Sequence, residues 1–131
     1  MTQARIAAGR IAEDFAAEML ARRGLDILER NVRVRYRELG IAGEIDIVAV
    51  HGRALVFVEV KAARVGARRG PERPALAVGR AKRVKLRRLA RARLASAPRL
   101  PRFGSIRFDV VGVELGLDGR ILDCEWIRDA F

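Results

Sequence analysis

The chain has 131 residues, of which 50% are hydrophobic and 33% charged, the size and composition of one globular domain. Its single cysteine, Cys124, excludes an internal disulfide framework, and no apolar run approaches the roughly 20 residues of a membrane-spanning helix. We therefore expect a single domain over residues 1–131 that is cytoplasmic and has no membrane partner.

The positive charge is unevenly distributed along the chain. The formal net charge is +11, and the segment from Lys61 to Arg107 has 16 basic residues against one acid, Glu72. The remainder has 11 basic and 15 acidic residues. Such segregation is typical of proteins that bind a polyanion and release its counterions. The sequence favours nucleic acid as the partner over an anionic membrane surface.

The first predicted elements are a helix and a strand. Apolar residues recur at helical spacing over residues 5–23, and Gly24 is suited to end the helix. The apolar stripe of this helix is expected to contain Ile11, Phe15, Met19 and Leu20. Valines then alternate with arginines over residues 25–38, which predicts a strand, and residues 39–43 break it.

A β-hairpin is predicted over residues 43–61. Gly52-Arg53 suits a two-residue turn, since Gly in the first position favours type II′. The resulting register gives the pairs His51–Ala54, Asp46–Glu59 and Glu44–Lys61. Directly opposed residues share a face, so the Asp46 and Glu59 carboxylates are expected about 5 Å apart, with Glu44 and Lys61 beside them.

The second half of the chain predicts a loop, a helix and two strands. Residues 62–77 have the Gly, Pro and Arg content of an exposed basic loop, and residues 78–97 form a helix with dense arginine. Strands follow over 105–115 and 120–127. The order α-β-β-β-α-β-β predicts an α/β (α+β) domain with helices packed on a mixed sheet.

The carboxylate pair is of the type that binds a hard cation. Mg²⁺ takes oxygen ligands and is held by one or two carboxylates, waters and substrate phosphates. Asp46, Glu59 and the carbonyl of Val60 are the predicted metal ligands, for Mg²⁺ or Mn²⁺. Lys61 is expected to orient a water or to stabilise negative charge in the transition state. The expected nucleic-acid-binding residues are Arg64, Arg68, Arg69, Arg80, Lys82 and Lys85.

Two motifs carry a resemblance to a known group of proteins. "GEIDIVA" at 43–49, followed by "VFVEVK" at 56–61, resembles the D-x(n)-E-x-K signature of the PD-(D/E)XK nuclease superfamily. Over nearly the whole length, including "GRIAE", "ERNVR" and "IRFDVVGV", the chain resembles the YraN family of small bacterial endonuclease-like proteins, an uncharacterised protein family.

The resemblance implies a restriction-endonuclease-like core, α-β-β-β-α-β, with a central mixed sheet flanked by helices and here an extra C-terminal strand. It also implies a metal on Asp46 and Glu59 and a catalytic Lys61. Glu13 matches an acid on the first helix that lies near the metal in related resolvases, and Glu44 is expected to be auxiliary.

The expected function is metal-dependent hydrolysis of phosphodiester bonds in DNA, including structured or branched DNA. Two alternatives stay open: a non-catalytic nucleic-acid-binding accessory protein with a vestigial or partner-activated site, and a small interaction module that forms a homodimer. Other residues are interpreted as structural: His51 as an exposed turn residue, Cys124 as a packing residue, and Arg107 with Asp109 as an ion pair.

Overall fold

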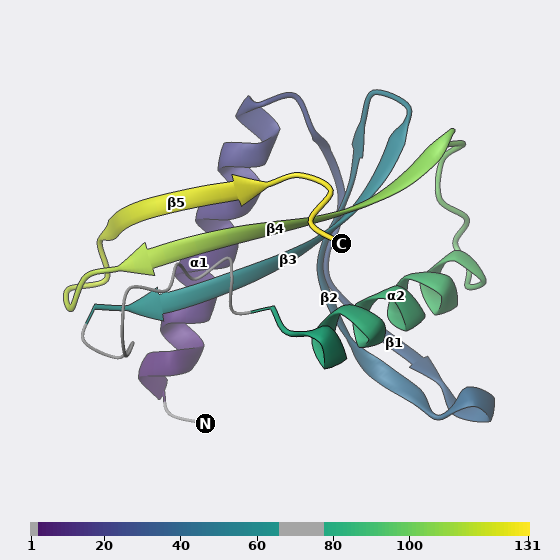
Figure 1. The fold of residues 1–131 in the computed structure, drawn as a ribbon, viewed down its shortest axis with the longest axis horizontal. Coiled ribbons are helices and arrows are strands. Elements are labelled where there is room, and N and C mark those ends of the chain that lie inside the picture. Colours follow the sequence, from purple (N-terminus) through teal and green to yellow (C-terminus); the bar gives the residue numbers. More distant parts are fainter. Residues whose placement is uncertain (1–2, 66–77) are drawn as a thin grey trace.

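The computed structural model describes residues 3–65 and 78–131. The elements are α1 (Gln3–Arg22), β1 (Asp26–Tyr36), the short 3₁₀ helix η1 (Arg37–Leu39), β2 (Ile41–His51), β3 (Ala54–Arg64), α2 (Arg80–Leu94), β4 (Ser105–Leu115) and β5 (Ile121–Ile127). This order is the predicted one (Figure 1). No helix in the described ranges is long and apolar enough to cross a membrane.

The strands form one mixed sheet in the order β1-β2-β3-β4-β5. β3 and β4 are parallel, and the other neighbouring pairs are antiparallel. α1 covers one face of the sheet and α2 covers the other (Figure 1). β3 is therefore buried on both faces, as its apolar sequence predicts: Val56 and Val58 pack toward α1, and Leu55 and Phe57 toward α2. The fold is the mixed α/β architecture of a restriction-endonuclease-like core.

The buried stripe of α1 consists mainly of alanine. Ala12, Ala16 and Ala17 are buried with Leu20, whereas Ile11, predicted to belong to the stripe, is 39% exposed. Small side chains let the helix axis approach the sheet closely, so the longer residues lie at the flanks of the contact. The helix ends as predicted at Gly24, which has a φ of 98°. The paired hydrogen bonds there are those of a Schellman motif.

α2 packs against the β1–β2 half of the sheet through Leu86, Leu89 and Ala92. Its close approach depends on Gly43, because a Cβ at this position would meet Leu89 at 3.0 Å and the Lys85 side chain at 3.1 Å. The glycine of the "GEID" motif therefore lets α2, with its basic residues, lie directly over β2.

The β2–β3 hairpin has the predicted turn and register, but its pairing is shorter than expected. His51 pairs with Ala54, and Gly52 has a φ of 61°. The ladder ends at Ile47–Val58, so the predicted pairs Asp46–Glu59 and Glu44–Lys61 are not formed. Beyond this point β2 stays with β1 and β3 stays with β4, and the two halves of the sheet diverge (Figure 1).

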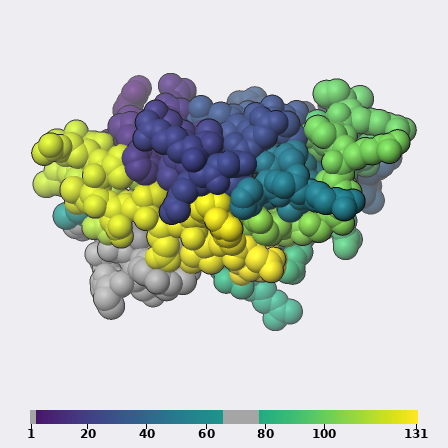
Figure 2. All heavy atoms as spheres, turned by 90° about the horizontal axis from the view of Figure 1, so that it is seen from above, coloured from purple at the N-terminus to yellow at the C-terminus, as the bar shows by residue number. Residues whose placement is uncertain are grey.

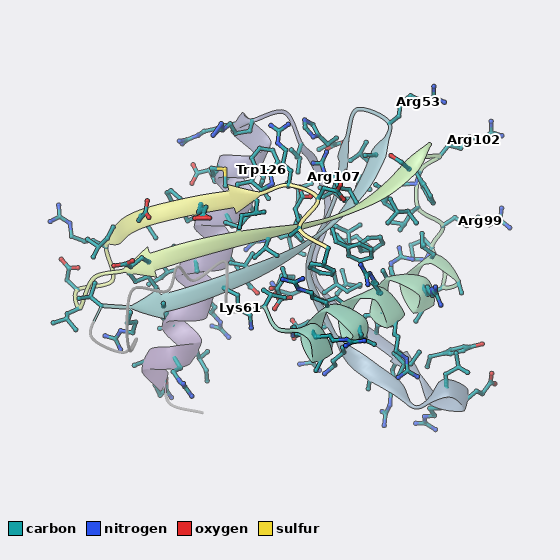
Figure 3. The ribbon with its side chains drawn as sticks, viewed as in Figure 1. Arg53, Lys61, Arg99, Arg102, Arg107 and Trp126 are labelled. Atoms are coloured by element: carbon teal, nitrogen blue, oxygen red, sulfur yellow. The ribbon has the colours of Figure 1, made fainter. Side chains whose placement is uncertain are left out.

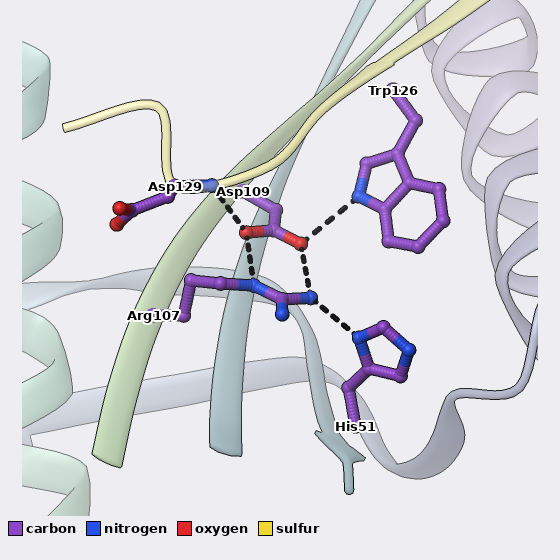
Figure 4. Close-up of polar contacts among 5 residues, drawn as sticks. All are labelled: His51, Arg107, Asp109, Trp126 and Asp129. Carbon is purple, nitrogen blue, oxygen red and sulfur yellow. Dashed lines mark hydrogen bonds and ion pairs between the residues drawn. The ribbon is translucent and has the colours of Figure 1, made fainter.

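A buried polar network joins β4 to β5, to the segment after β5 and to the last residue of β2 (Figure 4). Asp109 is fully buried and accepts hydrogen bonds from the Arg107 guanidinium, the Trp126 indole and the Asp129 backbone N–H. The predicted Arg107–Asp109 ion pair is thus present. His51 is not the exposed turn residue that was expected, since its Nδ1 lies 3.0 Å from Arg107 and it is half-buried.

The C-terminal residues are fixed by the same network. Ala130 donates its backbone N–H to the carbonyl of Phe108 at 2.7 Å, and the ring of Phe131 stacks on that of Phe108. Figure 2 shows the C-terminal part of the chain, coloured yellow and including β5, across the middle of one face beside the dark blue end of α1. Cys124 is half-buried and packs on the α1-side core, as predicted.

Candidate active site

The candidate site lies where β2 and β3 separate. Asp46 is the first β2 residue beyond the ladder, and its Oδ2 accepts a hydrogen bond of 2.8 Å from the backbone N–H of Val60. A carboxylate thus replaces a main-chain carbonyl as the acceptor for β3. The alternation of β2 also changes here, because Ile45 packs on the α2 side and Ile47 on the α1 side. Asp46 is therefore held in the opening between β2 and β3 by its hydrogen bond to β3.

Glu59 supplies the second carboxylate from β3. Its side chain is 5% exposed, on the same face as Leu55 and Phe57. Its Oε1 lies 3.7 Å from the Lys61 ammonium and 3.5 Å from the Lys82 ammonium of α2. Its Oε2 is buried and has no hydrogen-bond partner. Buried polar atoms in native proteins are nearly always satisfied, so this oxygen indicates a place for a ligand.

Glu13 approaches the same opening from α1. Oriented to satisfy its hydrogen bonds, the Asn31 amide donates to both Glu13 carboxylate oxygens, at 2.8 and 3.1 Å. Asn31 is a β1 residue with a φ of 52°, a conformation that asparagine tolerates better than most residues. It lies between the pairs Arg30–Ile47 and Val32–Ile45, at the level of Asp46 on β2. Asn31 thus holds Glu13 beside Asp46.

Burial and mutual repulsion raise the pKa values of two of these acids. Burial and the negative charge of Asp46 raise the pKa of Glu59 to about 7, and Lys82 and Lys61 oppose the rise. Burial, the charge of Asp46 and a hydrogen bond with Asp46 raise the pKa of Glu13 to about 7 as well. Glu44, exposed on β2, adds to the rise at Glu13 and Arg30 opposes it. Crowded carboxylates of this kind are typical of functional sites.

These shifts predict that the metal-free protein is more stable at pH 6 than at pH 8. A raised carboxyl pKa means that the folded state binds more protons than the unfolded state between about pH 4.5 and 7, so stability falls as pH rises through this range. We expect the melting temperature in EDTA to fall between pH 6 and pH 8. Glu59→Gln should reduce this fall and stabilise the protein at pH 8.

The matched control is Glu18→Gln, which removes an equal charge from the exposed part of α1, where Glu18 pairs with Arg22. Its melting temperature should follow the wild-type pH dependence. If the melting temperature of Glu59→Gln has the same pH dependence as that of the wild type, Glu59 does not bear the buried charge.

The residues fit a divalent cation held partly by water and substrate. No three His, Cys, Asp or Glu side chains in residues 3–65 and 78–131 are grouped to enclose a metal by themselves. Mg²⁺, however, commonly takes one or two carboxylates and fills its remaining positions with water and phosphate oxygens. The unpartnered Glu59 Oε2 and the raised pKa values at Glu59 and Glu13 indicate negative charge that a cation would neutralise. Whether the Val60 carbonyl joins this set stays a prediction.

The predicted nucleic-acid-binding residues lie in different places. Arg80 and Lys85 are exposed on α2, and Lys85 lines a recess of about 400 Å³ with Arg88 between α2 and Gly40–Ala42. Arg64 ends β3 and donates to the carbonyl of Leu117 at 3.4 Å. Lys82 is half-buried, and its ammonium lies 3.5 Å from Glu59 Oε1. Arg68 and Arg69 lie outside the described residues.

Sequence reasoning did not assign Asn31 or the contact between Lys82 and Glu59. Asn31 is one polar residue in an arginine-rich strand, and its partner on α1 is set only by the fold. For Lys82 a signal existed: Lys82 and Lys85 lie within the arc of the apolar stripe of α2, where a lysine would face the sheet.

Comparisons with known proteins identify the family of the chain. The model of the uncharacterised protein family UPF0102 matches residues 12–113. A UPF0102 protein from Symbiobacterium thermophilum is 48% identical over 126 residues, covering 94% of each chain. One from Moorella thermoacetica is 42% identical over 131 residues, covering both chains completely, and one from Dictyoglomus thermophilum is 37% identical over 126 residues, covering 94% of this chain and 95% of its own. The match confirms the resemblance to the YraN family: the chain belongs to the uncharacterised protein family UPF0102.

Proposed function

We propose that the protein is a metal-dependent nuclease that hydrolyses phosphodiester bonds in DNA. The observation that carries the proposal is the unpartnered, buried Oε2 of Glu59 beside Asp46, at the point where the central strands separate. Asp46 and Glu59 would hold Mg²⁺ or Mn²⁺ there. When bound, the cation supplies Lewis-acid stabilisation of the phosphate oxygens and a nearby water of increased acidity.

The remaining tasks of the reaction fall to side chains of the chain itself. Lys61 has a compact, movable ammonium that is 33% exposed, so it can donate a hydrogen bond to the attacking water or to a phosphate oxygen. Glu13, held by Asn31, is placed to accept a proton near Asp46 because its pKa is raised to about 7. Glu44 lies farther out and contributes charge only.

The surface beside the site suits a nucleic-acid backbone. Six basic residues of α2 are exposed: Arg80, Arg83, Lys85, Arg87, Arg88 and Arg91. Phosphates bound along this helix would bring the duplex past the opening in which Glu59 lies. Lys61 lies near the N-terminal end of α2 (Figure 3), since its ammonium and that of Lys82 approach the same Glu59 oxygen.

Cleavage of DNA in the presence of a divalent cation tests the proposal. Purified protein is mixed with branched, nicked, flapped and linear DNA, in Mg²⁺, Mn²⁺ or EDTA. We expect cleavage of at least one substrate with metal and none in EDTA. Lys61→Ala should slow cleavage by about 10²- to 10⁴-fold, the usual contribution of a positioned proton donor or acceptor.

Arg102→Gln is the matched control, since Arg102 lies at the end of the molecule away from Lys61 (Figure 3) and loses an equal charge. It should cleave at the wild-type rate. Absence of metal-dependent cleavage on every substrate, or equal cleavage by Lys61→Ala, would contradict the proposal.

The exposed cations of α2 support a second candidate, a nucleic-acid-binding accessory protein without catalysis. If this candidate is correct, the affinity for nucleic acid falls steeply with salt concentration, and the protein cleaves no substrate. Asp46→Ala should then bind nucleic acid as tightly as the wild type or more tightly.

A further inference from the structure

One oxygen of Glu59 has two cationic partners and the other has none. The ammonium groups of Lys82 and Lys61 lie 3.5 and 3.7 Å from Oε1, whereas Oε2 is buried without a partner. One lysine is enough to neutralise one carboxylate. Two ammonium groups at the same oxygen also repel each other, and the nearby charge of Asp46 offsets part of that repulsion.

Lys82 occupies a position that helix electrostatics disfavour. It is the third residue of α2, and the first turn of this helix has no acidic residue and no side-chain cap. The N-terminus of a helix carries a partial positive charge that favours anions and disfavours lysine. Residues that break such a local rule are often found at functional sites. The attraction between Lys82 and Glu59 offsets the unfavourable position of Lys82 at the helix N-terminus.

The packing of α2 directs Lys82 to this place. The absence of a side chain at Gly43 lets Leu89 and the Lys85 stem lie against β2. Lys82, one turn earlier on the same side of α2, is brought over Glu59 in the middle of β3, and its side chain is 35% exposed. It therefore contacts the buried carboxylate while keeping a path toward solvent, where a substrate phosphate would lie.

We propose that Lys82 is a displaceable counterion of the metal site: it neutralises Glu59 when no divalent cation is bound, and moves to the substrate phosphate when one is. The inference rests on the proposed function. A divalent cation at Glu59 repels the ammonium, and the four-carbon stem of lysine lets it swing without moving the helix. Lys61, attached to β3 itself, stays beside the carboxylates.

Direct metal binding tests the first half of the proposal. Mn²⁺ affinity is measured by calorimetry at pH 8.5, where proton competition is small, for the wild type, Lys82→Gln, Lys82→Arg and Lys85→Gln. We expect Lys82→Gln to bind Mn²⁺ at least threefold more tightly because a competing cation is removed. Lys82→Arg keeps the positive charge, so its Mn²⁺ affinity should be close to that of the wild type. Lys85→Gln, an equal charge change one turn along α2, should stay within twofold of it.

The coupling between metal and DNA tests the second half. Ca²⁺ is used in place of Mg²⁺ so that binding is measured in the absence of cleavage, and duplex affinity is determined with Ca²⁺ and with EDTA. We expect Ca²⁺ to tighten DNA binding by the wild type, and the tightening to be at least threefold smaller in Lys82→Gln. Lys85→Gln should lose affinity equally in both conditions, which leaves the coupling unchanged.

The outcomes separate this inference from the proposed function. If the wild type binds Mn²⁺ and Lys82→Gln binds it no more tightly than Lys85→Gln, the role of Lys82 is overturned and the metal site stands. If Lys82→Gln gains Mn²⁺ affinity while no protein cleaves DNA, the counterion role stands and the nuclease fails. If no protein binds Mn²⁺, both are overturned.

Discussion

Asp46→Asn is expected to abolish cleavage while making the metal-free protein more stable. The amide keeps an oxygen that can accept the Val60 N–H, so the local contact between β2 and β3 survives. It removes the negative charge that raises the pKa of both Glu59 and Glu13. Loss of one of the two proposed carboxylate ligands should lower the cleavage rate by about 10³-fold or more, since metal and water would then no longer be held in place.

The stability gain follows from the same removal of charge. At pH 8 the wild type keeps Asp46 near two other carboxyl groups, and part of that repulsion is lost in Asp46→Asn. We expect the melting temperature in EDTA at pH 8 to rise by about 3 to 5 °C, the shift that roughly 1 kcal/mol causes in a domain of this size. Thermal unfolding followed by circular dichroism gives this value, and a cleavage assay with Mn²⁺ gives the rate.

Asp123→Asn is the matched control, because Asp123 is exposed on β5 and loses an equal charge. Both its cleavage rate and its melting temperature should equal those of the wild type. An active Asp46→Asn protein would remove Asp46 from the metal site. A less stable one would show that the hydrogen bond to Val60 outweighs the repulsion.

Opposite changes in activity and stability are the usual result of charge gathered for function. A fold under no other constraint would place a neutral side chain at Asp46 and continue the β2–β3 ladder by one more pair. The ladder instead ends at Ile47–Val58. The separation of the strands and the crowding of Glu13, Asp46 and Glu59 are therefore one feature, which creates a charged opening in the middle of the sheet.

The sequence predicts the elements and the hairpin register because these depend on local physics. Gly52 sets the turn, and the turn sets which residues of β2 and β3 face each other. Alternation and helical spacing then give the order of strands and helices. The same register predicts that Asp46, Glu59 and Lys61 form one group.

The features that the sequence did not predict depend on contacts between distant segments. The Asp46 side chain competes with the main-chain ladder for the Val60 N–H, and pairing rules do not include such competition. Asn31 meets Glu13 only because β1 and α1 pack beside each other. Lys82 meets Glu59 only because Gly43 lets α2 lie close to the sheet. The three contacts occur at the same opening, which is where local rules are most often broken.

Asp109→Asn is expected to destabilise the fold severely, although Asp109 lies outside the candidate site. The carboxylate is fully buried, and each of its oxygens accepts two hydrogen bonds at 2.9 Å. An asparagine would direct an N–H group at two donors in place of one oxygen, and would leave the Arg107 guanidinium without its counter-charge. Breaking a buried ion pair by removing one partner typically costs about 3–5 kcal/mol.

Urea unfolding of Asp109→Asn, Arg107→Met and the double variant measures this effect. The double variant should lose less stability than the sum of the two single losses, because each single change leaves an unpaired buried charge and the double leaves neither. Asp26→Asn, at the exposed start of β1, is the control and should remain within about 0.5 kcal/mol of the wild type. Additive losses would show that Arg107 and Asp109 are not an energetic pair.

The extent of the Asp109 network also predicts that Asp109→Asn leaves metal binding unchanged. Asp109 binds the Asp129 N–H, and through this segment the chain reaches the Phe108–Phe131 stack, with Arg107 extending the contacts to His51. The hydrogen bonds and ion pairs described for Asp46 and Glu59 go instead to Val60, Lys61 and Lys82. At a temperature at which Asp109→Asn is still folded, its Mn²⁺ affinity should therefore equal that of the wild type. A loss of affinity under that condition would mean that the network also positions the carboxylates, through the parallel pairing of β3 with β4.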